Sequence, residues 1–320
     1  MLTLQDAWEA RQRLRPVLPE TPLLFSQPLT NIAGQPVYLK LEQMHVTGSF
    51  KLRGATNMIR SLTPEQRAQG VVTFSTGNHG FAVATAAASL GIRSVVCVSE
   101  NVPANKVEAL KASGAELHVE GSGQDEAGEV SARLVEEEGL TLIPPFDHPS
   151  VIAGQATMGL EIIEHLPSVK HVLTGLSGGG LLSGLGLALK EQIPDLELSG
   201  LSLREGAAMD ESLNIGKPTL VPEAPTLADS LLGGIGLENR YTFSMVQRYA
   251  DQRLRLHEDT IARGMAFLYD KHKMVVEGAA AVGAGALLDG LVSVNGPTVL
   301  IVSGSSVDVH THREAVAPYI

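Results

Sequence analysis

The stretch GVVTFSTGNHGFAVATAAASLGIRSVVCVS, residues 70–99, contains an apolar run, a glycine-rich turn, an alanine-rich segment and a second apolar run, in that order. Residues 70–76 and 94–99 have the length and the β-branched content of buried strands. Residues 81–90 predict a helix that Gly91 closes. A strand, a helix and a second strand in this order predict a βαβ unit whose two strands pair in parallel.

The same plan recurs further along the chain. Residues 171–176 predict a strand, residues 181–193 a helix and residues 196–203 a second strand, and residues 298–302 predict one more strand. Strands that are apolar throughout are typical of parallel sheets with helices on both faces. The sequence therefore predicts an α/β fold built on open, twisted and mostly parallel sheets.

The composition excludes several classes of function. The chain has 320 residues and a net charge of −11, with only 24 Lys plus Arg, so a basic surface that binds nucleic acid is not expected. The aromatic fraction of 4% argues in the same way against a stacking platform for single strands. Residues 278–288, the longest apolar stretch, are too few to cross a bilayer.

The cysteine content and the N-terminus predict the compartment. Cys97 has no partner for an intramolecular disulfide and lies in an apolar run, so we expect it to be buried as a small hydrophobic residue. The first residues have no basic segment followed by an apolar stretch, which is unlike a signal peptide. We therefore expect a cytoplasmic protein with no membrane partner.

A lysine begins the helical pattern of residues 50–62. The apolar stripe of this pattern consists of Lys51, Gly54, Ala55, Met58, Ile59 and Leu62. The opposite face carries Arg53, Thr56, Asn57, Arg60 and Ser61. A buried ammonium group is costly, and a Schiff base with an aldehyde cofactor would remove that cost and use the amine as a nucleophile. The alternative is that Lys51 extends from the end of the helix into solvent.

Two glycine-rich turns follow predicted strands and precede predicted helices. Residues 76–80 (TGNHG) form the first turn and residues 177–180 (SGGG) the second. Ligands gather at the carboxyl ends of parallel strands, and unpaired N–H groups at a helix N-terminus favour anions. We therefore expect a phosphate at one turn and a substrate carboxylate at the other, with ordinary tight turns as the alternative. The dinucleotide fingerprint and the P-loop pattern are absent, so a nucleotide is the weaker hypothesis.

Six segments together resemble the fold type II enzymes that depend on pyridoxal 5′-phosphate (PLP), in the serine/threonine dehydratase and serine racemase group. They are residues 47–55 (TGSFKLRGA), 75–80 (STGNHG), 146–147 with 154–157 (FD and GQAT), 177–181 (SGGGL), 276–280 (VEGAA) and 303–304 (SG). Each segment is weak by itself, but six in order and over nearly the whole chain are a strong signal. A finer resemblance, to hydroxyectoine-utilisation dehydratases, rests on residues 204–209, 227–231 and 233–237.

The resemblance implies the tryptophan synthase β-like architecture. PLP would lie in a cleft between two open, twisted, mostly parallel-sheet domains with helices on both faces. The large domain would comprise residues 1–62 and 149–320, and the small domain residues 63–148. A homodimer is the expectation of the group.

The resemblance also implies which residues bind the cofactor. Lys51 would hold PLP and act as the base, Phe50 would pack on the ring, and Asn78 would hydrogen-bond the ring hydroxyl. Ser303 would contact the pyridine nitrogen, where a hydroxyl can leave the nitrogen without a proton. The phosphate would lie against Gly178, Gly179, Gly180 and Leu181.

The substrate is expected beside a second group of residues. The resemblance places the substrate carboxylate near Ser75, Thr76, Gly77 and His79, and it implies a catalytic role for Thr76, which stands where serine racemases have a serine. The implied reaction removes water from a small β-hydroxy amino acid such as threonine, serine, hydroxyaspartate or a hydroxyectoine-derived amino acid, and it gives a keto acid and ammonia. A racemase, a β-replacement enzyme and a non-catalytic ligand-binding protein are the alternatives.

Some positions depart from the pattern of the group. Ser202 stands where serine racemases have a glutamate that helps to hold a divalent cation, and no metal site is predicted. We expect Asp210 on a solvated face and His312 to be exposed. Because the chain ends soon after Asp308, feedback control by an additional amino-acid-binding domain is not expected.

Overall fold

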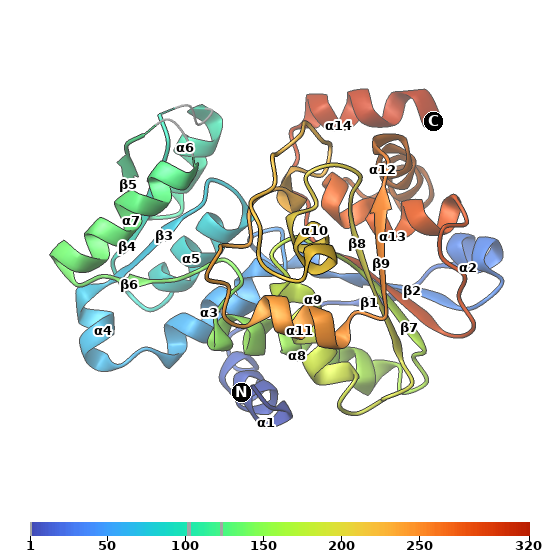
Figure 1. Cartoon of the computed structure of the whole chain (residues 1–320), viewed down its shortest axis with the longest axis horizontal. Coiled ribbons are helices and arrows are strands. Elements are labelled where there is room, and N and C mark those ends of the chain that lie inside the picture. The colour runs from blue at the N-terminus through green and yellow to red at the C-terminus, as the bar shows by residue number, and fades with distance from the viewer. Residues whose placement is uncertain (1, 101–103, 122–123) are drawn as a thin grey trace.

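The computed structural model describes residues 2–100, 104–121 and 124–320, and in these ranges the strands form two sheets (Figure 1). In spatial order, the larger sheet consists of β1 (Leu23–Phe25), β2 (Val37–Leu41), β10 (Thr298–Val302), β7 (His171–Gly175), β8 (Glu197–Leu203) and β9 (Gln252–Leu256). The smaller sheet consists of β5 (Glu116–Val119), β4 (Ser94–Val98), β3 (Val71–Phe74) and β6 (Thr141–Leu142). Neighbouring strands pair in parallel except β1, which is antiparallel to β2. The predicted α/β class with mostly parallel sheets is confirmed.

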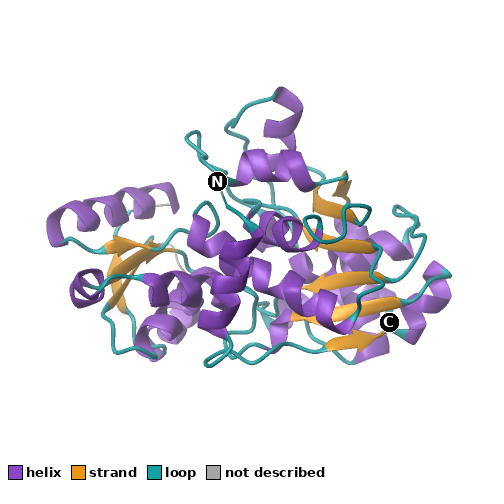
Figure 2. Cartoon of the chain, turned by 90° about the horizontal axis from the view of Figure 1, so that it is seen from below, coloured by secondary structure: helices purple, strands orange, loops and turns teal. Residues whose placement is uncertain are grey.

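Helices cover both faces of the larger sheet (Figure 2). One face packs against α1 (Leu4–Leu14), α8 (Pro149–His165), α9 (Gly180–Leu189), α10 (Ala208–Ile215) and α11 (Thr242–Tyr249). The other face packs against α2 (Gln27–Ala33), α12 (Glu258–His272), α13 (Gly278–Leu288) and α14 (Val309–Val316). Successive residues of a strand point to opposite faces, so Val299 and Ile301 enter the first core whereas Leu300 and Val302 enter the second.

The smaller sheet has its own helical layers. The helices α3 (Lys51–Ser61), α5 (Asn78–Ala88) and α6 (Ala104–Ala112) pack on one face, and α7 (Gln124–Glu138) packs on the other. The remaining short helices are α4 (Pro64–Gln69), η1 (Glu42–Met44), η2 (Asp229–Leu231) and η3 (Ala317–Tyr319). Cys97 lies in the α7 core and is 1% exposed, as predicted, and burial raises the pKa of its thiol to about 11.

Two helix boundaries differ from the prediction. Helix α5 begins at Asn78 rather than at residue 81. Gly80 makes this start possible, since a Cβ at that position would overlap the main-chain oxygen of Ser75. Helix α9 ends at Leu189 rather than at residue 193, where Gln192 N donates to the carbonyl oxygen of Leu189, three residues back, in place of the helical acceptor four residues back.

Two polar residues that were expected to be exposed are buried. Asp210 is 7% exposed because its carboxylate accepts hydrogen bonds from Arg253 Nη1 at 2.7 Å and from Arg255 Nε at 2.6 Å. His312 is 5% exposed and lies edge-on to the ring of Tyr269. Both expectations were wrong because the local sequence does not reveal a partner on another element.

The smaller sheet is formed by strands between Val71 and Leu142, and the strands of the larger sheet lie outside that stretch. The exact division into residues 63–148 and the rest of the chain stays a prediction. Within the described ranges, no helix has both the length and the apolar content needed to cross a membrane.

Candidate active site

Lys51 is the first residue of α3, and its amine faces the crossing segment, residues 144–148, which joins β6 to α8. Lys51 Nζ donates a hydrogen bond to the carbonyl oxygen of Pro145 at 2.8 Å and lies 5.4 Å from the centroid of the Phe50 ring. Burial lowers the pKa of Lys51 to about 8, although the charge of Glu277 acts in the opposite direction. An amine with this pKa is partly unprotonated near neutral pH, as a nucleophile or a general base must be.

Glycine contacts hold the Lys51 helix close to its neighbours. A Cβ on Gly154 of α8 would lie 2.7 Å from the main-chain oxygen of Arg53 and 2.7 Å from the Cα of Gly54. A Cβ on Gly184 of α9 would lie 2.7 Å from the main-chain nitrogen of Ala156. Helices α3, α8 and α9 therefore pack at backbone contact, which sets the position of Lys51 relative to the start of α9.

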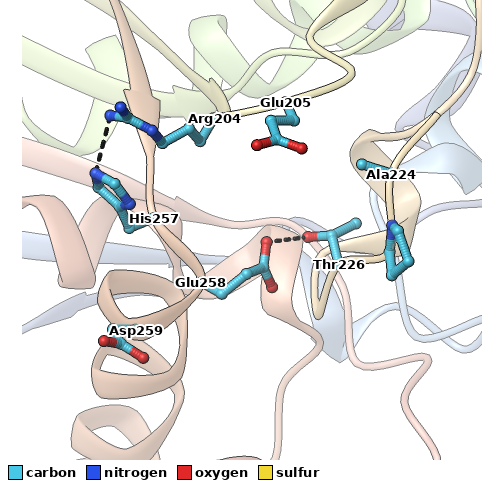
Figure 3. A pocket seen from close by; sticks show the side chains of 8 residues that line it. Arg204, Glu205, Ala224, Thr226, His257, Glu258 and Asp259 are labelled. Carbon is cyan, nitrogen blue, oxygen red and sulfur yellow. Dashed lines mark hydrogen bonds between the residues drawn. The ribbon is translucent and has the colours of Figure 1, made fainter. Parts of the chain in front are cut away.

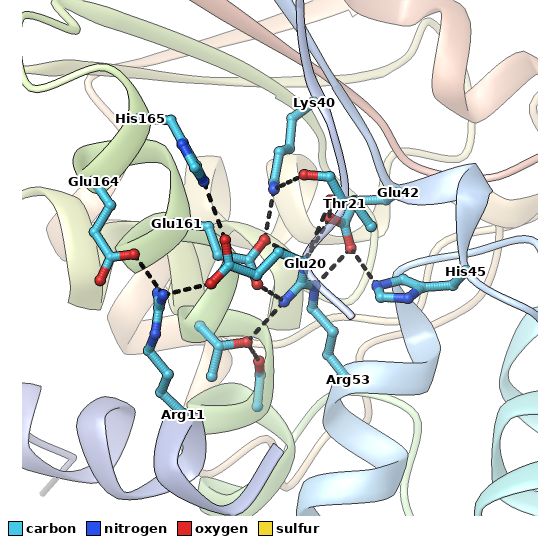
Figure 4. Close-up of polar contacts among 12 residues, drawn as sticks. Arg11, Glu20, Thr21, Lys40, Glu42, His45, Arg53, Glu161, Glu164 and His165 are labelled. Carbon is cyan, nitrogen blue, oxygen red and sulfur yellow. Dashed lines mark hydrogen bonds and ion pairs between the residues drawn. The ribbon is translucent and has the colours of Figure 1, made fainter. Parts of the chain in front are cut away.

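A buried ion network, which consists of Lys40, Glu42, Arg53 and Glu161, includes a residue of the Lys51 helix, Arg53 (Figure 4). Arg53 donates from Nε to Glu42 at 2.7 Å and from Nη1 to Glu161 at 2.6 Å. Lys40 Nζ contacts Glu161 at 2.5 Å. The exposed fractions of these residues are 5% or less. Two positive and two negative side chains therefore balance their charges out of contact with solvent.

The network keeps the carboxylate of Glu42 ionised. Burial by itself would raise the pKa of Glu42, but the charge and the hydrogen bonds of Arg53, together with His45 Nε2 at 3.3 Å from Glu42 Oε2, outweigh burial and hold this pKa well below its usual value. The sequence analysis assigned no role to these four residues. The available signals were a lysine in the buried strand VYLKL, residues 37–41, and a glutamate in the apolar helix α8.

The glycine loop, which consists of Gly178, Gly179 and Gly180, ends at the N-terminus of α9. Gly179 has φ +85°, and among the described residues none accepts a hydrogen bond from the main-chain N–H of Gly178 or Gly179. Free N–H groups at a helix N-terminus favour an anion. Leu181, which follows, is 7% exposed with its side chain in the core, so it can offer an anion only its main chain.

The side chains of Phe146 and Val246 pack against the glycine loop. A Cβ on Gly178 would overlap the ring of Phe146, and one on Gly180 would lie 2.9 Å from the Cβ of Phe146. A Cβ on Gly179 would lie 2.8 Å from Val246 Cγ2. All three positions therefore require glycine for space, and Gly179 requires it for its backbone conformation as well.

The end of β10 meets the start of α3. The main-chain N–H of Phe50 donates to the carbonyl oxygen of Ser303 at 3.0 Å, and Ser49 forms a β-bridge with Gly304. Ser303 is 5% exposed. Phe50, Lys51 and Ser303, which are distant in the sequence, are thus brought together.

Asn78, at the start of α5, is bound to Glu277. Asn78 Nδ2 donates to the two carboxyl oxygens of Glu277 at 3.2 and 2.9 Å, and the main-chain N–H of Ser306 donates to Glu277 Oε2 at 3.0 Å. Glu277 is 3% exposed. Burial raises the pKa of Glu277 to about 7, with a further increase from the charge of Asp229 and a decrease from the Asn78 hydrogen bond. The sequence analysis quoted Glu277 in a motif but gave it no role.

Replacement of Glu277 by glutamine should remove a pH-dependent part of the stability of the PLP-free protein. The folded pKa of about 7 exceeds the ordinary value of 4.5, which corresponds to about 3 kcal/mol at about 1.36 kcal/mol per pKa unit. Folding disfavours the charged form of Glu277. The contribution of the protonated carboxyl group to the free energy of unfolding is therefore complete below pH 4.5 and is lost as the pH rises through about 7. Urea unfolding at about pH 4.5 and about pH 8 would measure the loss, and Glu277→Gln should lack most of it.

Glu205→Gln serves as the control for that measurement, because Glu205 is exposed. It should keep the pH dependence of the unmodified chain. An identical loss of stability with pH in the unmodified chain and in Glu277→Gln would contradict the prediction.

The residues predicted to meet the substrate lie between β3 and α5. Ser75, Thr76 and Gly77 are partly exposed, and the N–H of Gly77 donates to Ser75 Oγ at 3.4 Å. His79 is 3% exposed, and its Nε2 is 2.9 Å from the carbonyl oxygen of Ile143. Burial, and then the charge of Lys51, lower the pKa of His79 to about 3, so its imidazole is neutral. Contact of these residues with a substrate stays a prediction.

A cavity of about 380 Å³ lies elsewhere, at the ends of β8 and β9 (Figure 3). Its lining consists of Arg204, Glu205, Ala224, Pro225, Thr226, His257, Glu258 and Asp259. None of the predicted site residues is among them, and Glu258 is already bonded to Thr226 Oγ1 at 2.6 Å. Within the described ranges, no group of three or more His, Cys, Asp or Glu side chains could hold a metal ion.

Two mostly parallel sheets with helices on both faces form the fold expected of a PLP enzyme of fold type II, and comparison with known proteins agrees with this class. Residues 14–304 match the family model described as "Pyridoxal-phosphate dependent enzyme". The chain therefore belongs to the family of PLP-dependent enzymes.

Relatives and solved structures define the group within this family. A provisionally named threonine dehydratase of Sinorhizobium fredii is 46% identical over 98% of this chain and 95% of its own length. The L-threonine ammonia-lyase of Thermotoga maritima is 38% identical over 97% of this chain and 77% of its own length. The structure of maize serine racemase superimposes with a TM-score of 0.92 at 32% identity, over 99% of this chain and 98% of that one. The predicted group, the cofactor and the broad class of PLP-dependent dehydratase or ammonia-lyase are confirmed.

The residues present fit PLP on structural grounds. The glycine loop offers N–H groups to a phosphate where no side chain would fit. Asn78 Oδ1 is buried and has no partner among the described residues, although Asn78 Nδ2 is bonded to Glu277. Lys51 offers an amine of lowered pKa, and Ser303 a buried hydroxyl group. The finer resemblance to hydroxyectoine-utilisation dehydratases stays a prediction.

Proposed function

We propose that this protein is an ammonia-lyase that converts L-threonine to 2-oxobutanoate and ammonia, with L-serine as a second substrate. The placement of Lys51 carries the proposal, because its amine is held by Pro145 in a partly buried position and has a pKa of about 8. The two similar proteins from Sinorhizobium fredii and Thermotoga maritima, which are named for activity on threonine, support the choice of substrate. The products together contain all the atoms of threonine, so no further reactant is needed.

The chain supplies binding, orientation and proton transfer. When bound, PLP supplies the electron sink that lets the Cα–H bond break and the β-hydroxyl leave. The N–H groups of the glycine loop would hold its phosphate, Asn78 would hydrogen-bond its ring hydroxyl, and Ser303 would contact its ring nitrogen. Lys51 Nζ takes the proton from Cα of the amino acid, for which a pKa close to the working pH is favourable. The loop of Ser75, Thr76 and Gly77 holds the substrate carboxylate.

The direct test is an assay for keto acid and ammonia. Purified protein with PLP would be incubated with L-threonine, L-serine, hydroxyaspartate and an ectoine-derived hydroxy amino acid. The proposal expects equal amounts of keto acid and ammonia, with L-threonine the best substrate. Absence of keto acid from the whole panel would overturn the proposal. A higher rate with another compound of the panel would make that compound, rather than L-threonine, the preferred substrate.

Similarity to maize serine racemase supports a second candidate, amino-acid racemisation. Thr76 keeps a hydroxyl where that group of enzymes has a serine, so it is the residue we assign to the opposite face of the substrate. Chiral analysis of serine recovered from the same assay separates the two activities, since elimination alone leaves the remaining serine in its original configuration. Analysis of the products formed with added thiols would reveal β-replacement.

Homodimer formation and a cytoplasmic location stay predictions.

A further inference from the structure

The glycine loop is held between two walls that come from different parts of the chain. The first wall is Phe146 of the crossing segment, whose side chain packs on Gly178 and Gly180. The second wall is α11, since a Cβ on Gly179 would lie 2.8 Å from Val246 Cγ2 and 3.1 Å from the Cβ of Thr242. The two walls contact the loop from different sides, and Met209 of α10 also lies against Gly179, at 2.9 Å from a Cβ there.

Asp147 joins the two walls. It directly follows Phe146, and its carboxylate accepts three main-chain hydrogen bonds from the start of α11. The donors are Arg240 N at 2.7 Å, Tyr241 N at 2.9 Å and Thr242 N at 2.8 Å. Phe146, the glycine loop, α11 and Asp147 therefore form a closed ring of contacts.

The start of α11 is capped in part by a residue from another part of the chain. Tyr241 occupies the N-cap position, and no side-chain hydrogen bond caps the helix from there. Asp147, 94 residues before Tyr241, accepts the N–H groups of the N-cap residue Tyr241 and of the first helical residue Thr242, whereas Asn239 Oδ1 accepts that of Phe243 at 2.8 Å. The negative charge of Asp147 also suits the positive end of the helix dipole. Without Asp147, three N–H groups would lose their acceptor, and in the described part of the chain no hydrogen bond would join the start of α11 to the segment that carries Phe146.

We propose that Asp147 is a positioning residue for the phosphate of the cofactor, which acts through Phe146 and α11 on the glycine loop without contact with PLP itself. The inference rests on the assignment of the phosphate to the glycine loop in the proposed function. A residue that acts in this way affects only ligands that carry a phosphate. Its effect can therefore be separated from a general effect on folding.

The experiment compares two ligands of the PLP-free protein, PLP and pyridoxal, which lacks the phosphate. Dissociation constants would be measured by absorbance titration for the unmodified chain, Asp147→Ala and Asp147→Asn. Asp147→Ala should weaken PLP binding by roughly tenfold, the effect of a lost helix cap, and change pyridoxal binding by less than about twofold. Asp147→Asn keeps one carbonyl oxygen for Tyr241 and Thr242, so its loss should be smaller, and it provides a result if the alanine variant does not fold.

Asp308→Ala is the matched control. Asp308 caps α14 through His310 N at 2.8 Å and Thr311 N at 3.2 Å, so its removal costs a similar cap on a helix that does not contact the glycine loop. It should leave the affinities for both ligands unchanged.

The outcomes separate the positioning role of Asp147 from the two assignments on which it rests, the phosphate at the glycine loop and the threonine activity. Equal weakening of PLP and pyridoxal in Asp147→Ala would show a merely structural role, and unchanged or tighter PLP binding would also overturn the inference. If the unmodified chain bound PLP no better than pyridoxal, the phosphate assignment itself would be wrong. Failure of the threonine assay, by contrast, would remove the proposed substrate and leave these binding results intact.

Discussion

Replacement of Lys51 by alanine should lower the rate of keto-acid release by at least about a thousandfold, since the variant loses both a covalent attachment point and a general base. The amine lies against Pro145 O and has a pKa of about 8 in the folded chain. No other described lysine has been placed beside Phe50, Ser303 and the glycine loop. The variant should bind PLP without a covalent bond, because the phosphate contacts remain.

Borohydride reduction followed by mass analysis would measure the covalent attachment. The unmodified chain should carry one reduced adduct, at Lys51, and the alanine variant should carry none. Lys217→Ala is the control, because Lys217 is exposed on the surface, and it should keep both the adduct and the activity. An adduct at another lysine together with retained activity would show that Lys51 is not the attachment point.

Replacement of Arg53 by methionine should destabilise the protein by about 3–5 kcal/mol, the usual result when one partner of a buried ion pair is removed. Arg53 contacts Glu42 and Glu161, and the exposed fraction of its side chain is 3%. Lys40 remains beside Glu161 in the variant, so Glu42 becomes the buried charge without a cationic partner in the network. Urea unfolding at neutral pH would measure the change in the free energy of unfolding.

Three further variants, Arg60→Met, Glu42→Gln and the double variant Arg53→Met/Glu42→Gln, test whether the lost stability comes from the unpaired charge. Arg60→Met is the control on the same helix, since Arg60 is partly exposed, and it should cost less than about 1 kcal/mol. The double variant Arg53→Met/Glu42→Gln should recover part of the lost stability, because it removes the charge that Arg53 neutralised. If the double variant were as unstable as the sum of the two single variants, charge compensation would not be the cause.

The ion network is connected with the active site through α3, the helix that carries both Arg53 and Lys51. Arg53 is two residues from Lys51 on α3, and its partners belong to η1 and α8. Displacement of α3 would therefore move Lys51 away from Pro145 as well as expose buried charges. Rigid placement of a catalytic group by its supporting residues is a general requirement for activity.

Local patterns were enough to predict the α/β class and the approximate elements. The predicted strands at residues 70–76 and 298–302 became β3 (Val71–Phe74) and β10, and the stripe that starts at Lys51 became α3. The boundaries were less accurate. Helix α5 begins at Asn78 inside the glycine-rich turn, because the close approach of Gly80 to Ser75 is a tertiary contact that no local pattern shows.

The sequence by itself determined the class of fold, the family, the cofactor and the lysine at the head of α3, because these depend on periodicity and on short motifs of adjacent residues. The tertiary structure alone decided which polar residues become partners. Glu277 binds Asn78 across 199 residues, Arg53 binds Glu161 across 108, and Asp147 binds Tyr241 across 94. A polar side chain has the same local pattern whether it faces water or a buried partner, and only the folded chain brings the partner within hydrogen-bond distance.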